Sequence, residues 1–79
     1  MNEREFRKKG MDLMTIFMGE KPTKEEKKVR KDFVRGDYRS FKVYLEELEI
    51  TEGNKPTDST SWLSLVNESR ELLKYVSDL

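Results

Sequence analysis

The chain has 79 residues, of which 41% are charged and 34% hydrophobic, and its 16 basic side chains balance 16 acidic ones. It contains no Cys and no His, which excludes disulfide bonds and metal sites built from those residues. A chain of this length forms one domain with a modest core, and no apolar run approaches the roughly 20 residues that span a bilayer.

The first predicted helix covers residues 2–18. Its apolar face is formed by side chains that recur at helical spacing, together with one glycine: Phe6, Gly10, Leu13 and Phe17. Gly10 weakens a helix unless a neighbouring element packs closely against it. Gly19 is expected to end the helix.

The second predicted helix covers residues 24–35. Thr23 and Glu26 have the spacing of a capping box, in which each side chain accepts a hydrogen bond from the other residue's backbone. Gly36 is expected to end the helix. The apolar face is thin, since only Val29 and Phe33 point to one side.

The third and fourth predicted helices cover residues 38–49 and 61–77, and a loop over residues 51–59 joins them. Both helices carry broad apolar stripes, so we expect them to supply most of the core, with the other helices packed around the fourth. The sequence therefore predicts an all-α fold. Residues 1–79 form a single domain, a small bundle of about four helices.

The sharpest functional feature is a row of cations on the second helix. Five of them fall within roughly 100° of helical arc, opposite Val29 and Phe33: Lys24, Lys27, Lys28, Lys31 and Arg35. Most lysine-rich helices are simply solvated by water. Such solvated faces, however, more often carry acidic and basic side chains together. The row therefore predicts a partner-binding surface for an anionic macromolecule, with a plain solvated face as the alternative.

A second feature is a row of methionines on the first helix. Met11, Met14 and Met18 lie about 100° from the face that carries Phe6 and Leu13. One interpretation is an exposed apolar contact surface, through which two copies could form a homodimer. The other is that the first helix is central and buried on two sides.

No residues form a set suited to catalysis. Ser59 and Ser61 have no His to act as a base, and the chain has neither a Gly-x-Ser-x-Gly turn nor a glycine-rich phosphate loop. The carboxylates at the end of the third helix lack the spacing of a calcium loop, so a solvated acidic face is expected there. We therefore predict no enzyme activity, no metal and no cofactor.

The distribution of charge bears on the choice of partner. Residues 1–42 carry a net charge of +5 (13 − 8), and residues 43–79 carry −5 (3 − 8). Nucleic-acid-binding domains are usually strongly basic overall, and the third helix carries Glu46, Glu47 and Glu49, which phosphates repel. A protein with an acidic surface is thus the favoured partner, and nucleic acid bound by the same basic helix is the alternative.

We expect a small, non-catalytic regulatory or inhibitory protein that lies in the cytoplasm, does not bind membranes and acts by binding another macromolecule. Small size, heavy charge and no catalytic set are also typical of the short accessory proteins of bacteria and their phages.

Overall fold

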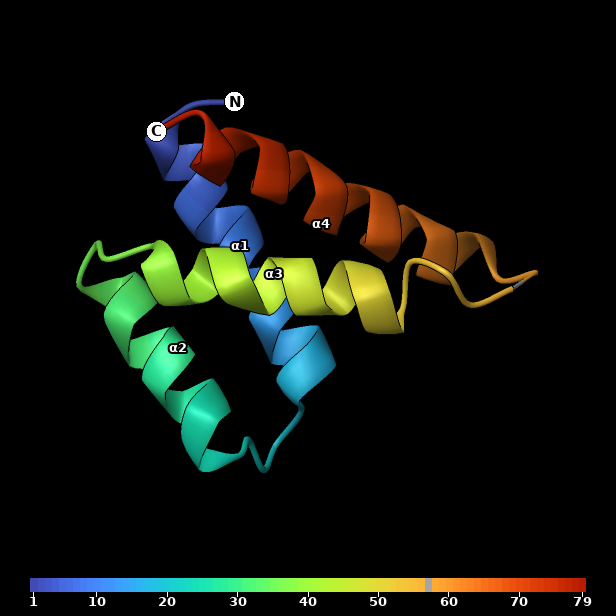
Figure 1. Ribbon diagram of the computed structural model, residues 1–79, viewed down its shortest axis with the longest axis horizontal. Helices are drawn as coiled ribbons and strands as arrows, with labels where there is room; N and C mark the ends of the chain where they lie inside the picture. The colour runs from blue at the N-terminus through green and yellow to red at the C-terminus, as the bar shows by residue number, and fades with distance from the viewer. Residues whose placement is uncertain (57) are drawn as a thin grey trace.

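Helices make up 74% of the chain in the computed structural model, which describes residues 1–56 and 58–79 (Figure 1). In chain order they are α1 (Glu3–Met18), α2 (Lys24–Val34), α3 (Arg39–Thr51) and α4 (Thr60–Ser77). The predicted all-α bundle of four helices is confirmed, with no strand in the part of the chain described. Each helix begins and ends within two residues of its predicted bounds, and position 57 of the predicted loop lies outside the described residues.

Local signals in the sequence set the helix ends. The predicted capping box forms in both directions, since Glu26 N–H donates to Thr23 Oγ1 at 3.2 Å and Thr23 N–H donates to Glu26 Oε1 at 2.8 Å. Gly19 follows α1 with a φ of 69°, and Gly36 follows α2 with a φ of 87°. Both values lie in the left-handed region, where the backbone of residues other than glycine is strained.

The packing order differs from the prediction that three helices surround α4. In Figure 1, α3 crosses the centre of the molecule in front of α1, with α2 below and α4 above. α3 packs against α2 and α4, and α1 packs against the same two helices, while α2 and α4 make no contact in the described part. The short turn at Gly36 folds α3 back onto α2, and the other side of α3 packs against α4.

Among the described residues, α3 and α4 together supply six of the 11 buried hydrophobic side chains, as expected, but α1 supplies four, more than any other single helix. α1 also supplies more of the fully buried large side chains than any other helix, because it packs against both α2 and α4 and its Phe6 ring also meets Phe41 of α3. These side chains are Phe6, Leu13 and Met14 from α1, Phe33 from α2, Phe41 and Leu45 from α3, and Leu72 from α4. Among the described residues, no helix has the length and apolar content needed to cross a membrane.

Gly10 is the point of closest approach between α1 and this core. A Cβ atom placed on Gly10 would lie 2.6 Å from Phe33 Cζ and 3.2 Å from Phe41 Cζ. Both rings are fully buried, so they have little room to move. The absence of a side chain at position 10 therefore lets α1 pack directly against the two rings.

Replacing Gly10 with alanine should destabilise the protein by about 1–2 kcal/mol, because overpacking outweighs the gain of about 1 kcal/mol in helix propensity. Chemical denaturation measures the change. Asp12→Ala is the control, since Asp12 is exposed in the same helix and its side chain has no polar partner in the described structure. This variant should stay within about 0.5 kcal/mol of wild type. If Gly10→Ala stabilised the protein, as propensity alone implies, the close approach would be refuted.

Candidate interaction surface on α2

The five cations of the second helix share one exposed face in the structure. We call this face, made of Lys24, Lys27, Lys28, Lys31 and Arg35, the basic ridge. It is exposed because α2 anchors itself by the opposite side, where Phe33 is fully buried and Val29 is partly buried against the core. The geometry thus presents the cations to solvent on a rigid element.

The ridge lysines and Arg35 differ in how their charges are satisfied. Within the described residues, none of the four ridge lysines has a carboxylate partner within 4.0 Å. Arg35 does, because its Nη2 donates to Asp32 Oδ1 at 3.0 Å. The charge of Arg35 is therefore partly neutralised within the protein. The ridge charges that have no carboxylate partner in this part of the chain are those of Lys24, Lys27, Lys28 and Lys31.

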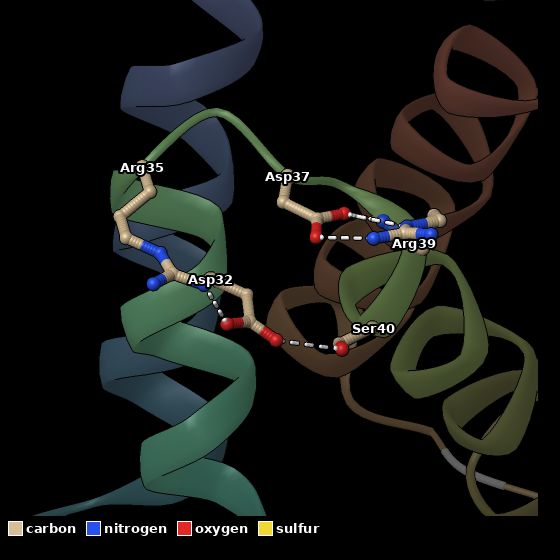
Figure 2. Close-up of polar contacts among 5 residues, drawn as sticks. All are labelled: Asp32, Arg35, Asp37, Arg39 and Ser40. Carbon is tan, nitrogen blue, oxygen red and sulfur yellow. Dashed lines mark hydrogen bonds and ion pairs between the residues drawn. The ribbon is translucent and has the colours of Figure 1, made fainter.

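Two carboxylates on the inner side of the α2–α3 turn explain this difference (Figure 2). Asp32 is buried at the end of α2, where it also accepts a hydrogen bond from Ser40 Oγ of α3 at 3.0 Å. Asp37 binds Arg39 through both carboxylate oxygens, at 3.0 and 2.9 Å. Hydrogen bonds from the side chain and backbone of Arg39 lower the pKa of Asp37 to about 2. Both carboxylates thus serve the turn and leave the lysines unpaired.

The position of the ridge is fixed from α1 by Arg7. Its Nη2 donates to the carbonyl oxygen of Val34 at 2.8 Å, and its Nη1 donates to Tyr38 Oη at 3.0 Å. Tyr38 Oη in turn donates to Glu3 Oε1 at 3.0 Å. The cation therefore meets the negative end of the α2 dipole and the following turn. Nothing in the local sequence around Arg7 indicated this contact, which joins residues 27 positions apart.

Two shallow hollows flank the ridge. The first lies between α2 and α3, has a volume of about 450 Å³, and has an apolar floor that includes Val29, Val43 and Tyr44. Its charged lining residues are three glutamates, Glu25, Glu26 and Glu47, and one ridge lysine, Lys28. Burial, with a smaller effect of Glu26, raises the pKa of Tyr44 to about 12.

The second hollow lies on the other flank of α2 and also has a volume of about 450 Å³. Pro22 and Val34 supply its apolar surface, and the remaining lining comes from cationic side chains, namely Lys27, Arg30, Lys31 and Arg35. We call it the Val34 hollow. The helical spacing already places Val34 beside Lys27 and Lys31, but only the structure shows that Pro22 completes the apolar surface.

The methionine row does not form an exposed contact surface. Met14 and Met18 are buried in the core, and Met11 is partly buried against it. α1 is covered on both adjoining faces, so these side chains fill the bundle. A second copy could reach Met14 and Met18 only if the bundle opened.

Two of the four acidic residues at the end of α3 are engaged within the molecule. Arg70 of α4 binds Glu49 at 2.9 Å and lowers its pKa, and Lys55 lies 3.2 Å from Glu52. Glu46 and Glu47 remain exposed. Among the residues described, no group of three or more acidic side chains is arranged to hold a metal ion.

No protein-family model, no curated protein and no solved structure matches this chain. The candidate surface is therefore defined by the geometry of this chain alone.

Proposed function

We propose that this protein acts by binding, without catalysis, and that its basic ridge docks on an acidic surface of a partner protein. The observation that carries the proposal is the set of four lysines on one face of α2 without an internal carboxylate partner in the described structure. Outside the ridge, Arg39, Lys55 and Arg70 pair with carboxylates of the chain, whereas exposed lysines such as Lys8, Lys42 and Lys74 do not within the residues described. The ridge is distinguished by the gathering of four such lysines on one face of a single helix.

The ridge carries an energetic cost that a partner would relieve. Lys24/Lys28, Lys27/Lys31 and Lys31/Arg35 are like-charge pairs four residues apart, and each is unfavourable by about 0.2–0.5 kcal/mol. Carboxylates of a bound partner would turn this mutual repulsion into attraction. They would also speed the encounter, since long-range attraction between opposite charges raises association rates.

Two features favour a protein over nucleic acid. α2 has 11 residues and so spans about 16 Å, which limits the number of phosphates that it can neutralise. Exposed carboxylates also lie close by, with Glu25 on α2 itself and Glu47 across the hollow between α2 and α3. These carboxylates would repel a continuous phosphate backbone, whereas a protein surface needs only a local match of charges.

Charge reversal of the ridge tests the proposal. The ridge variant carries Lys24→Glu, Lys28→Glu and Lys31→Glu, and its binding to polyglutamate should weaken by about tenfold or more relative to wild type. The control variant carries Lys8→Glu, Lys42→Glu and Lys74→Glu, three exposed lysines on the other helices, and changes the net charge by the same amount. Fluorescence anisotropy with labelled polyglutamate, across a series of salt concentrations, measures both.

The control variant should bind nearly as well as wild type. Equal losses in the two variants would mean that net charge alone governs binding, which contradicts a role for the ridge. Duplex or single-stranded nucleic acid, measured in parallel, should bind more weakly than polyglutamate. If wild type bound a nucleic acid tightly and the ridge variant did not, the nucleic-acid alternative would replace the proposal.

A further inference from the structure

We propose that the partner's docking segment is an acidic peptide carrying a large apolar side chain, and that this side chain seats in the Val34 hollow. This inference rests on the proposed function of the basic ridge and names the chemistry of what binds there.

The Val34 hollow combines an apolar surface with a cationic border. Val34 is 54% exposed, although it occupies a helix whose other apolar residues, Val29 and Phe33, are partly or fully buried. It follows Lys27 by seven residues and Lys31 by three, so the three side chains lie along one edge of α2. Pro22, from the connection between α1 and α2, also lines the hollow.

One cation of the border, Arg30, is held in place by α1. Arg30 Nη2 donates to Thr15 Oγ1 of α1 at 3.3 Å, which directs the guanidinium toward α1. The methylene chains of Lys27, Arg30 and Lys31 line the hollow, and long cationic side chains of this kind cover apolar surface while their charges reach water. The hollow therefore offers both apolar contact and positive charge to a bound segment.

This pattern matches an acidic peptide with an apolar anchor. A phosphate backbone would meet the cations but gain nothing from Val34 and Pro22. A peptide with one large apolar side chain between carboxylates would satisfy both, since an anchor buried in a pocket commonly supplies much of the binding energy of an interface. The hollow's volume of about 450 Å³ lies within the usual range for ligand sites.

Two synthetic peptides of equal length and charge test the inference. Both consist of glutamates around one central position, which is Phe in the first peptide and Ser in the second. Isothermal titration calorimetry should show that wild-type protein binds the Phe peptide about fivefold or more tightly than the Ser peptide, because the ring leaves water.

Val34→Ser should abolish this preference, while Val43→Ser should retain it. Val43 is a matched control because it is 56% exposed and lines the other hollow. Both valines are exposed, so both variants should fold, and a thermal melt checks this.

The outcomes separate the two proposals. If wild type bound both peptides equally, or if Val34→Ser kept the preference for Phe, the proposed binding of an apolar side chain in the Val34 hollow would be wrong. The proposal for the basic ridge would still stand. If wild type bound neither peptide, the proposed function would fail as well. If only Val43→Ser lost the preference for the Phe peptide, the apolar side chain would bind in the hollow between α2 and α3, and the assignment to the Val34 hollow would be wrong.

Discussion

Replacing Phe6 with alanine should destabilise the protein by about 3–5 kcal/mol, the usual cost of removing a fully buried aromatic ring. The Phe6 ring lies at the centre of an aromatic cluster drawn from every other helix and from the α2–α3 turn. Its neighbours, with distances between ring centroids, are Tyr75 (4.6 Å), Tyr38 (4.9 Å), Phe33 (5.6 Å) and Phe41 (5.7 Å).

A domain of this size has a free energy of unfolding of about 4–12 kcal/mol, so the Phe6 change removes a large share of it. Urea denaturation followed by circular dichroism measures the loss. Ile16→Ala is the matched control, because Ile16 lies on the same helix but is exposed, and it should cost less than about 1 kcal/mol. Equal, small losses in both variants would show that the aromatic cluster does not hold the bundle together.

Replacing Arg7 with alanine should destabilise the protein by about 2 kcal/mol. The change removes charge-assisted hydrogen bonds to Val34 O and Tyr38 Oη, the favourable interaction of a cation with the carbonyl end of α2, and a contact with the Phe33 ring, whose centroid lies 5.9 Å from Arg7 Cζ. Arg7→Lys should recover less than half of the loss, because a single ammonium group lacks the planar fork that reaches both acceptors.

Arg4→Ala provides the control for the loss of one positive charge from α1. Arg4 is exposed and has no polar partner in the described part of the structure, so its removal should change the free energy of unfolding by less than about 0.5 kcal/mol. If thermal and urea denaturation showed the same effect for Arg7→Ala and Arg4→Ala, the contact between Arg7 and the end of α2 would contribute nothing to stability.

The sequence predicted those parts of the fold that depend on near neighbours. The capping box of Thr23 and Glu26 and the glycines at positions 19 and 36 act within one helical turn, so their effect is visible in the sequence. The exposure of the four ridge lysines follows in the same way, because burying Phe33 on one side of a helix directs residues half a turn away to solvent.

The sequence did not predict features that depend on contacts between distant segments. For the first helix the sequence left two interpretations open, because a helical period does not show which of two adjoining apolar faces is covered. The structure shows the central, doubly buried position, in which Gly10 admits the rings of Phe33 and Phe41. The same limit applies to Met14 and Met18, whose spacing fits both an exposed row and a buried one. The hydrogen bond from Ser40 Oγ to Asp32 Oδ2 is of the same kind, because the turn has to bring α3 back onto α2 to form it.

The most direct test of the basic ridge as the binding surface is a nuclear magnetic resonance titration of the wild-type protein with polyglutamate, following every backbone amide. Binding through the ridge predicts that the largest chemical-shift changes fall within residues 24–35, with small changes around Lys8, Lys42 and Lys74. Shifts spread evenly over all exposed lysines, or concentrated outside α2, would contradict the account.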